Sequence, residues 1–509
     1  MVRPKIKKIQ PEFVDVRQWF DTNLDAEVVD LTDQKVYENV YHDGRFAATF
    51  QFTESGAQRF ARRARPRSIM DIAAVTSIYR PGPLQAGVDE AYVRDKEFVE
   101  AGETLTYEHP IIGDVLSATY GHMCFQEHFM MIGNKLGGLS WDDCDKLRKI
   151  LVKKSIGSDV NEKKAADAEI IRQRFMTGAM ERGMTQEGVD ALWEKMCFFN
   201  GYGFNASHAV SYALDSFMCA HLQTYHEAEW LSAYAEEYAS DGPKKRARVL
   251  SDVRTLGYQL VPVDVNYAGR TWKIIPGKKM MPSFTTIKGI GDAAVSEILA
   301  NRPYRTIYDL LWNDDGSWRH TKFNKRAMSN LISIGAFDSM GLVGEHAMFT
   351  NYRHMHEAVI DHWDQLRKRK GRELMAELSA VRTVEDWTRE EKVVQYIELV
   401  GSVDLDIIID PDVVKRLQDK GIPSVDDAES EDTTLRWFIV MSMIAAKTKK
   451  GKPYLKITCV GEAGIEYKMN IWGWTPDRGG VQRFAAYLGD VERSDWGLSC
   501  TPWKMKALC

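Results

Sequence analysis

The sequence lacks the features that mark secreted, disulfide-bonded and membrane-spanning proteins. Its seven cysteines are widely spaced and form no Cys-x-x-Cys pair, so neither a zinc ribbon nor a disulfide framework is indicated. The basic first residues contain no apolar stretch of the kind that a secretory signal needs. The longest apolar run, residues 437–446, is about half as long as a bilayer-spanning helix. We therefore expect a cytoplasmic protein without a membrane partner.

A strong net charge is also missing, because 67 basic residues face 72 acidic ones and the formal net charge is −5. This balance argues against a generally basic coat for nucleic acid. Hydrophobic residues make up 44% of the 509 residues and charged residues 27%, which is ordinary for globular proteins and excludes wholesale disorder. A chain of this length predicts roughly three domains.

The basic residues are nevertheless concentrated in four short clusters. Each cluster alone is most often a solvated helix face or loop, but concentrating like charge costs self-repulsion unless an anion neutralises it. We therefore interpret the clusters together as a binding path for nucleic-acid phosphates. They are Arg59, Arg62, Arg63, Arg65 and Arg67; Lys146, Arg148, Lys149, Lys153 and Lys154; Lys244, Lys245, Arg246 and Arg248; and Lys447, Lys449, Lys450 and Lys452.

The second cluster fits a helix with one buried face and one charged face. At helical spacing, Leu147 and Leu151 share the buried side, while Lys146 and Lys149 lie nearly opposite. Arg148 falls at the border, where a half-shielded guanidinium is well placed to form two bonds with one phosphate. The pattern therefore indicates a polyphosphate or a nucleic-acid backbone as the ligand.

Residues 284–302 contain an apolar–Gly–apolar–Gly turn between two helical segments. Gly289 and Gly291 permit a tight turn whose amides, with the N-terminus of the next helix, can hold a DNA phosphate, and Lys288 adds charge. This is typical of a helix–hairpin–helix that contacts DNA without regard to base sequence. A plain helical hairpin that uses glycine for its turn fits the same residues.

The pattern becomes β-like after residue 426, and residues 435–475 resemble the first strands of an OB-fold with a basic hairpin tip at 447–452. Such barrels bind single strands through basic grooves and stacking aromatic rings. Core positions in a small barrel suit the same rings, and the alternation does not decide between the two. The candidate rings are Trp437, Tyr454, Tyr467 and Trp472.

Several blocks occur in the order found in the bacterial replicative DNA polymerase III alpha subunit, and the chain resembles this C-family polymerase over residues 45–345. The blocks are TFQFTESGAQRF (49–60), IAAVTSIYRPGPLQAGV (72–88), YGHMCFQEHFM (120–130), DKLRKILVKK (145–154), FNGYGFNASHAVSYA (199–213), VPVDVN (261–266), FTTIKGIG (284–291) and NKRAMSNLISIGAFDSMG (324–341). The OB-like segment also stands where this family places one.

The resemblance implies a multidomain chain with a mainly α fingers region, an α helix–hairpin–helix module and a β OB-like barrel at the C-terminus. We expect a palm–fingers edge segment in residues 1–45, fingers in 46–255 and the helix–hairpin–helix module in 256–345. A charged helical connector (346–425) and the OB-like domain (426–509) would follow.

The resemblance also implies roles for individual residues. Arg148 and Lys149 would reach the triphosphate of the incoming nucleotide. The family has two arginines there, so Lys149 keeps the positive charge but cannot form the two parallel hydrogen bonds of a guanidinium. Gln126 and Glu127 would hold the fingers to the palm. The nucleotide pocket would be shaped by Gly201, Gly203, Asn205, Ser207 and His208.

Two residues of this pocket also have a local interpretation. We expect Ser207 to cap the helix that begins in this block, whatever its role toward the nucleotide. For His208, a buried and hydrogen-bonded core histidine is the alternative to a place in the pocket.

The carboxylates that the family uses to bind two Mg²⁺ ions are missing from the matched blocks. Nucleotidyl transfer needs clustered carboxylates to hold both metals, and the family's three palm aspartates precede the region matched here. Asp404-Leu-Asp406 lies where the family has no catalytic function, and we interpret it as an exposed strand end. We therefore expect no catalytic and no metal-binding residue on this chain, with Mg²⁺ bound only in an assembled polymerase.

The sequence thus predicts part of a DNA-directed DNA polymerase that binds deoxynucleoside triphosphates and primed DNA and is inactive without a separate palm-bearing chain. Lys288, Gly289 and Gly291 would grip duplex phosphates, and the tip that carries Lys447, Lys449, Lys450 and Lys452 would meet the single-stranded template.

Other interpretations remain open at this point. A non-catalytic DNA-binding replisome scaffold derived from such a polymerase is the main alternative, and catalysis by Asp404 and Asp406 is a third. The family carries a sliding-clamp peptide near the hairpin module, and no convincing one is found here, so the clamp stays open as a partner. Both a naturally split protein and a gene fragment fit the sequence.

Overall fold

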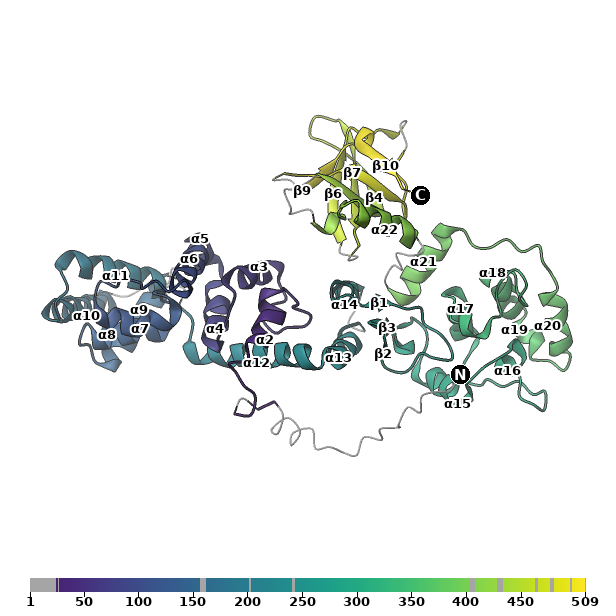
Figure 1. Ribbon diagram of the computed structural model, residues 1–509, viewed down its shortest axis with the longest axis horizontal. Coiled ribbons are helices and arrows are strands. Elements are labelled where there is room, and N and C mark those ends of the chain that lie inside the picture. The colour runs from purple at the N-terminus through teal and green to yellow at the C-terminus, as the bar shows by residue number, and fades with distance from the viewer. Residues whose placement is uncertain are drawn as a thin grey trace. The chain divides into compact units, whose positions relative to one another are not determined.

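The computed structural model describes residues 24–25, 27–155, 162–200, 203–239, 243–401, 408–427, 434–462, 466–476, 480–494 and 497–508. The chain divides into two compact units, Met1–Glu227 and Ala228–Cys509 (Figure 1). Within the described ranges no helix combines the length and the apolar character that a membrane crossing requires.

Unit 1 is helical throughout its described part. Its elements are α2 (Gln34–Val36), the π-helix η1 (Tyr37–His42), α3 (Ser55–Ala64), α4 (Ile69–Ile78), α5 (Pro81–Gln85), α6 (Val88–Glu100), α7 (Pro110–Leu116), the 3₁₀ helix η2 (Ser117–Thr119), α8 (Gln126–Lys135), α9 (Trp141–Ser155), α10 (Glu162–Glu181), α11 (Gln186–Asn200) and α12 (Ala206–Tyr225), with α13 (Glu227–Ala239) beginning at its last residue.

The first core of unit 1 lies between η1, α3, α4 and α12. The apolar stripe of α3, which includes Phe60 and Ala61, is buried in this core, where the Phe60 ring lies 6.4 Å from that of Tyr92 on α6. Burial of one such aromatic side chain contributes about 2–3 kcal/mol. The RPGP segment predicts a helix end after Tyr79, and α4 ends one residue earlier, at Ile78, with Tyr79 as its C-cap, before α5 begins at Pro81.

The second core of unit 1 is formed by residues of the five helices α7, α8, α9, α10 and α11. The predicted buried face of α9 is confirmed, because Cys144 and Leu147 are each 1% exposed and pack with Phe129 and Phe175. Ser140 accepts a hydrogen bond from the Asp143 amide at 3.1 Å, as its capping position predicts. One predicted helical run, residues 207–238, is instead two helices, since α12 ends at Tyr225 and α13 begins at Glu227.

The helical part of unit 2 surrounds a three-stranded sheet of order β1-β3-β2, in which β1 and β3 are parallel. Its strands are β1 (Gln259–Leu260), β2 (Lys273–Ile275) and β3 (Lys279–Met281). Its helices are α14 (Pro243–Thr255), η3 (Phe284–Thr286), α15 (Asp292–Asn301), α16 (Ile307–Leu311), α17 (Lys325–Ser333), η4 (Asp338–Met340), α18 (Tyr352–His356), the π-helix η5 (Glu357–Asp361), α19 (Trp363–Leu366), α20 (Gly371–Ser379), α21 (Arg389–Val400) and α22 (Pro411–Asp419).

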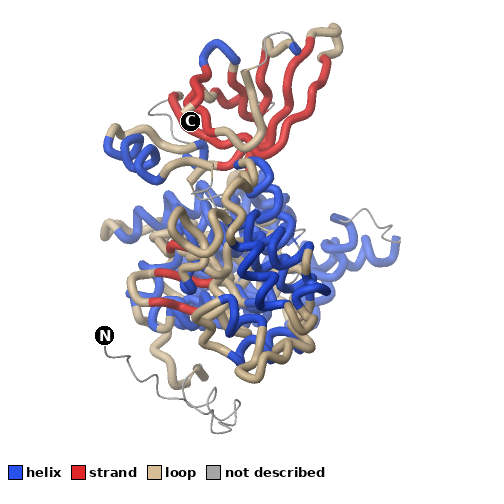
Figure 2. The backbone as a smooth tube through the Cα atoms, turned by 90° about the vertical axis from the view of Figure 1, so that its right-hand side faces the viewer, coloured by secondary structure: helices blue, strands red, loops and turns tan. Residues whose placement is uncertain are grey.

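The C-terminal part of unit 2 is a curled, mixed seven-stranded sheet of order β10-β7-β4-β5-β6-β9-β8 (Figure 2). Its strands are β4 (Leu435–Lys447), β5 (Pro453–Val460), β6 (Glu466–Trp472), β7 (Ala486–Asp490), β8 (Glu492–Ser494), β9 (Gly497–Cys500) and β10 (Met505–Ala507), with η7 (Val425–Asp427) and η9 (Pro502–Lys504) beside them. Strand β4 pairs with β7 through Leu435–Ile439 and with β5 through Ile439–Lys447, and the register shift between Val440 and Ser442 bends the strand, which helps to curl the sheet into a half-barrel. The predicted fold class, a mainly helical chain that ends in an OB-like β domain, is confirmed.

Candidate nucleotide-binding and nucleic-acid-binding sites

The N-termini of α8 and α12 are fastened together in unit 1. Gln126 at the start of α8 donates its backbone amide to Phe204 O at 2.8 Å and its side-chain amide to Gly203 O at 2.9 Å. The Glu127 carboxylate accepts from Asn205 Nδ2 and from the Ala206 amide, both at 2.8 Å. The structure thus joins two sequence blocks, residues 120–130 and 199–213, that lie far apart along the chain.

The Arg148 guanidinium on α9 reaches the same place. Its Nη1 donates to Gln126 Oε1 at 2.9 Å and its Nη2 donates to Asp145 Oδ1 at 2.7 Å. The side chain is 23% exposed, which matches the half-shielded position predicted for it. Gln126 therefore bridges Arg148 and Gly203, two of the residues predicted to bind nucleotide.

Lys149 is the more accessible of the two predicted triphosphate ligands. Its side chain is 64% exposed and its Nζ lies 2.6 Å from Asp145 Oδ2. Hydrogen bonds from Lys149 and Arg148 lower the pKa of the Asp145 carboxyl, so this group stays ionised between the two cations. A bound phosphate would compete with Asp145 for both side chains.

The start of α12 corrects one prediction about its cap. Asn205, and not Ser207, is the N-cap residue, because the Asn205 carbonyl oxygen Oδ1 accepts from the His208 amide at 3.0 Å. Ser207 lies inside the first turn and donates its hydroxyl to the same oxygen at 2.6 Å. As the N-cap, Asn205 satisfies the free amide of His208, the third residue of α12, so the helix begins two residues earlier than a capping Ser207 would allow.

His208 is exposed, so the alternative of a buried core histidine is wrong. Its ring lies between the rings of Phe204, at a centroid distance of 5.1 Å, and Tyr212, at 4.0 Å. The structure therefore places His208, Asn205, Ser207 and Gly203 around one helix N-terminus. Gly201 lies outside the described residues.

Arg80 is a residue of this site that the sequence did not single out. Its guanidinium carbon lies 3.8 Å above the centroid of the Phe204 ring, and its burial lowers its pKa. The only sequence signal was its place in the RPGP segment, because the stacking partner is more than a hundred positions away along the chain. With Arg148 and Lys149 it gives the site three cations beside the positive end of the α12 dipole.

The glycine turn of unit 2 precedes α15. Gly289 has a left-handed backbone with φ of +84°, whereas Gly291 has φ of −90° and is the N-cap of α15. The Lys288 amide donates to Leu399 O at 2.8 Å, and the Lys288 carbonyl accepts from Asn330 Nδ2 at 2.6 Å. The turn is thereby fixed, and the first segment of the predicted pair is only the short 3₁₀ helix η3.

The outer side of this turn is polar. No side chain caps α15, and the Lys288 side chain is exposed beside it. Arg326 of α17, a second cation that the sequence did not single out, packs close to Gly289 and is also exposed. Uncapped amides and two cations form a suitable surface for a phosphate, although Asp292, paired with Arg270 at 3.2 Å, adds one nearby acid.

The four candidate aromatic rings of the OB-like sheet differ in how far they are exposed to solvent. Trp437 is 1% exposed and belongs to the core, and Tyr467 packs against a core cluster. Tyr454 and Trp472 are cross-strand neighbours whose rings lie 4.6 Å apart, and Trp472 is 37% exposed. Trp503, 66% exposed and packed over Gly473, is a further ring that sequence reasoning missed.

The hairpin tip is confirmed as a turn between β4 and β5 in which all four predicted lysines are exposed: Lys447, Lys449, Lys450 and Lys452. In the described part of the chain, no group of three or more His, Cys, Asp or Glu side chains is placed to hold a metal ion. Asp404 and Asp406 lie outside the described residues.

Comparison with known proteins finds matches for two regions of the chain. Residues 6–181 match the family described as the bacterial DNA polymerase III alpha subunit finger domain, and residues 257–346 match a helix–hairpin–helix motif. The DNA polymerase III subunit alpha of Campylobacter jejuni is 31% identical over 351 residues, a match that covers 67% of this chain and 28% of that protein.

The same subunit of Aquifex aeolicus is 29% identical over 331 residues, which cover 65% of this chain and 27% of the relative. That of Thermus aquaticus is 30% identical over 334 residues, with 64% and 26% covered. The chain thus spans little more than a quarter of the length of these relatives. The chain therefore contains a finger domain of the bacterial DNA polymerase III alpha type and a helix–hairpin–helix motif, and these relatives are DNA polymerase III alpha subunits that it matches over part of their length.

Proposed function

We propose that this chain is the nucleotide-triphosphate-binding and DNA-binding part of a replicative DNA-directed DNA polymerase, and that a separate chain supplies the palm aspartates. In this assembly the chain would act in the cytoplasm on primed DNA and deoxynucleoside triphosphates. The division into fingers (46–255), helix–hairpin–helix (256–345), connector (346–425) and OB-like (426–509) segments is part of the same proposal.

One observation carries the nucleotide-binding part of this proposal. The Gln126 side chain joins Gly203, at the start of the α12 block, to Arg148 of the basic helix. The two family blocks predicted to bind the same nucleotide therefore meet through hydrogen bonds.

The chemistry of the site suits a triphosphate. Arg148 offers a planar fork, Lys149 a mobile point charge, and Arg80 a cation held against an aromatic ring. The N-terminus of α12 adds oriented amides, and the exposed His208 ring is placed to shape the same pocket. These groups bind and orient a polyanion but supply no general base.

The described residues do not fit the metal ions of a polymerase. Two Mg²⁺ ions need clustered carboxylates, and the described residues contain no such cluster. We therefore place the Mg²⁺ ligands on the proposed palm chain, and derive no step through the metal on this one.

DNA contact is supported by two surfaces of unit 2. Lys288, Gly289 and Gly291 lie at the uncapped start of α15, where sequence-independent phosphate binding is expected. The lysines of the β4–β5 tip and the pair formed by Tyr454 and Trp472 suit a single strand, because lysines neutralise phosphates and rings stack with bases.

Binding of the full chain to a fluorescent primer–template DNA tests the DNA-binding part of the proposal. The dissociation constant should rise steeply between about 50 and about 300 mM salt, with a logarithmic slope of about 0.9 for each neutralised phosphate. Fluorescence anisotropy measures this slope. Absence of binding at low salt, or binding that salt does not weaken, would contradict the proposal.

The two glycines of the hairpin give a matched pair of variants. In Gly289→Ala the new Cβ would lie 2.9 Å from Asn330 Nδ2, and the left-handed backbone costs about 1–2 kcal/mol. In Gly291→Ala no atom lies within 4 Å of the new Cβ. We expect both variants to bind DNA several-fold more weakly, about 3- to 30-fold, but only Gly289→Ala to lose hydrogen-exchange protection in the turn.

Comparison of these two variants distinguishes an effect of the shape of the turn from an effect of its direct contact with DNA. Because Gly291→Ala leaves the turn intact, weaker binding by this variant reports DNA that approaches the backbone at Gly291. Unchanged DNA affinity in Gly291→Ala would contradict the proposed contact at Gly291. Unchanged DNA affinity in Gly289→Ala would show that DNA binding does not depend on the shape of the turn.

A further inference from the structure

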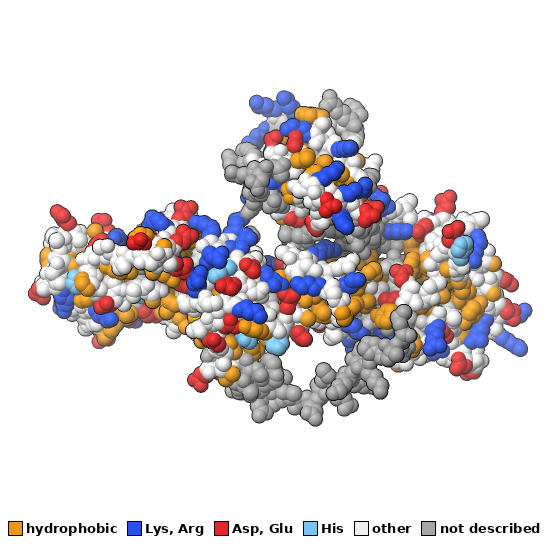
Figure 3. All heavy atoms as spheres, in the orientation of Figure 1, with side chains coloured by type: hydrophobic (Ala, Val, Ile, Leu, Met, Phe, Trp, Pro, Cys, Tyr) orange, Lys and Arg blue, Asp and Glu red, His pale blue; other side chains and the backbone are white. Residues whose placement is uncertain are grey.

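The outer face of α3 and the turn that follows it carry five arginines outside the sites described above. The arginines are Arg59, Arg62, Arg63, Arg65 and Arg67, and all five are exposed. The apolar residues of α3 point the other way, into the first core of unit 1. Figure 3 shows basic side chains gathered over the part of the molecule where α3 lies.

Two acidic residues of α6 contact the arginines of this face. No Asp or Glu occurs between Ser55 and Met70. Arg67 Nε lies 3.2 Å from Glu100 Oε1 and Arg63 Nη1 lies 3.8 Å from Asp89 Oδ2, both acids belonging to α6. The segment 55–70 itself carries five positive charges and no negative one.

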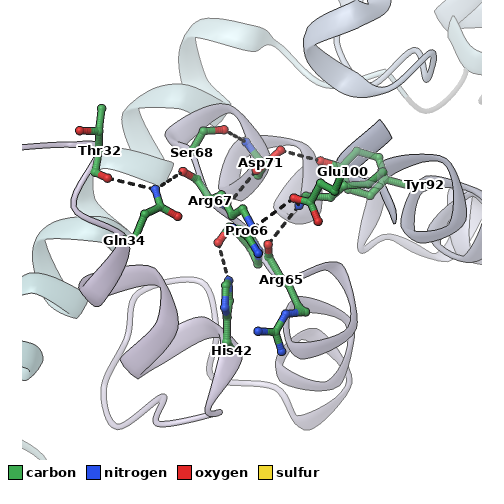
Figure 4. A network of polar contacts seen from close by, with 11 residues as sticks. Thr32, Gln34, His42, Arg65, Pro66, Arg67, Ser68, Asp71, Tyr92 and Glu100 are labelled. Carbon is green, nitrogen blue, oxygen red and sulfur yellow. Dashed lines mark hydrogen bonds and ion pairs between the residues drawn. The ribbon is translucent and has the colours of Figure 1, made fainter. Parts of the chain in front are cut away.

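The turn of residues 65–67 is held by side chains from several elements (Figure 4). Each of its three carbonyl oxygens accepts a side-chain hydrogen bond: Arg65 O from Lys96 Nζ at 3.2 Å, Pro66 O from His42 Nε2 at 2.8 Å, and Arg67 O from Gln34 Nε2 at 3.0 Å. The Arg67 amide donates to Asp71 Oδ2 at 2.9 Å. The backbone of the turn is therefore fixed from inside.

Lys96 is the most unusual member of this network. Its side chain is 1% exposed and is paired with Glu100. Burial of an ammonium group costs free energy unless the group is paired and hydrogen-bonded. A neutral donor would satisfy one carbonyl oxygen at a lower desolvation cost than this lysine. The same Glu100 also contacts Arg67, which connects the buried pair directly to the arginine face.

Arg65 ends α3 in a left-handed conformation with φ of +44°. Glycine or asparagine normally occupies this position, because a larger side chain is strained there. An arginine in this place indicates that the side chain is retained for something other than ending the helix.

We propose that the α3 face and the turn 65–67 bind the phosphate backbone of nucleic acid, with the buried network holding the arginines in place. The inference rests on the proposed function and adds to it a DNA-binding surface in unit 1. Arginine forks match phosphate geometry. The exposed face of α3 presents no large apolar side chain, which a protein partner would need at the centre of an interface and a DNA backbone does not.

The double variant Arg62→Ala/Arg65→Ala in the full chain tests this proposal with a fluorescent primer–template DNA. Loss of two phosphate contacts should lower the logarithmic salt slope by about 1.8 and weaken binding at least about tenfold. The control Arg172→Ala/Arg174→Ala removes the same charge from α10, where both arginines face acids, and should keep the wild-type slope. An unchanged slope in the first variant, or an equal loss in the control, would overturn the proposal.

The variant Arg65→Gly separates binding from folding. It should keep or raise the melting temperature, because glycine adopts the left-handed conformation without strain, and lower the salt slope by about 0.9. Wild-type binding by Arg65→Gly would remove Arg65 from the surface.

Two further outcomes have distinct meanings. If the wild-type chain does not bind DNA at all, the proposed function fails, whereas wild-type binding with unaffected variants overturns only the α3 surface. If polyglutamate competes as well as DNA and depends equally on Arg62 and Arg65, the partner is an acidic protein segment, and the proposal is wrong.

Discussion

A primed template should remain unextended when this chain is the only polymerase protein present, and extension should begin when a chain that carries the palm aspartates is added. The reason is electrostatic: without two metal ions on clustered carboxylates, nothing holds the attacking 3′ oxygen against the triphosphate or neutralises the developing charge. We expect the chain alone to be slower than the mixture by at least roughly a thousandfold.

A gel assay of primer extension with Mg²⁺ and all four deoxynucleoside triphosphates measures this difference. A neighbouring open reading frame that encodes the Asp-x-Asp palm would supply the second chain, and the same chain with both aspartates replaced is its control. Extension by the present chain alone would contradict the split arrangement. A mixture that binds primed DNA and still does not extend it would favour the alternative of a non-catalytic replisome scaffold.

The variant Arg148→Ala should lower kcat/KM for nucleotide incorporation in the assembled enzyme by about 10- to 150-fold, which corresponds to charge-assisted hydrogen bonds of about 1.5–3 kcal/mol. Arg148 is a largely buried cation of the proposed triphosphate site and is already aligned by Gln126. Lys149→Ala should cost less, because the Lys149 side chain is mostly exposed and forms no fork.

Steady-state kinetics at several nucleotide concentrations checks this prediction, and Arg148→Lys tests the fork itself. If geometry matters as well as charge, Arg148→Lys should recover only part of the lost activity. Arg174→Ala, which removes an exposed arginine from α10, is the control and should behave as the wild type. Wild-type kinetics in Arg148→Ala would remove this residue from the nucleotide site.

Local periodicity was sufficient for the helices whose buried face is regular. The spacing around Leu147 predicts both the buried side of α9 and the border position of Arg148, and the structure has both. The β4–β5 tip was predictable for a similar reason, since a lysine–glycine turn interrupts two alternating segments. These features depend on residues within a few positions of one another.

Features that depend on distant residues were not predictable in the same way. Arg80 stacks on Phe204, and Arg326 packs beside Gly289, through contacts between elements that only the folded chain brings together. The choice between Asn205 and Ser207 as a cap depends on where the helix begins, which both residue types allow equally.

The glycines and tryptophans illustrate the same limit. Gly289 and Gly291 look equivalent in the motif, yet only the first has a left-handed backbone. Trp437 and Trp472 both follow an alternating pattern, but Trp437 is buried in a cluster with Val393 of α21 and Leu417 of α22, whereas Trp472 is partly exposed. Sequence alternation identifies two faces of a strand but not which of them becomes the core.

The carboxylate of Asp145 occupies the position of an anion between Arg148 and Lys149. The Asp145 carboxylate thus stands where a phosphate oxygen would bind. In the proposed function, a nucleotide phosphate would replace this carboxylate as the partner of the two cations. Arg148 uses Nη2 for Asp145 and Nη1 for Gln126, whose side chain also donates to Gly203 O. A movement of the Arg148 guanidinium toward a phosphate would therefore pull on Gln126, and through it on the residues that precede α12.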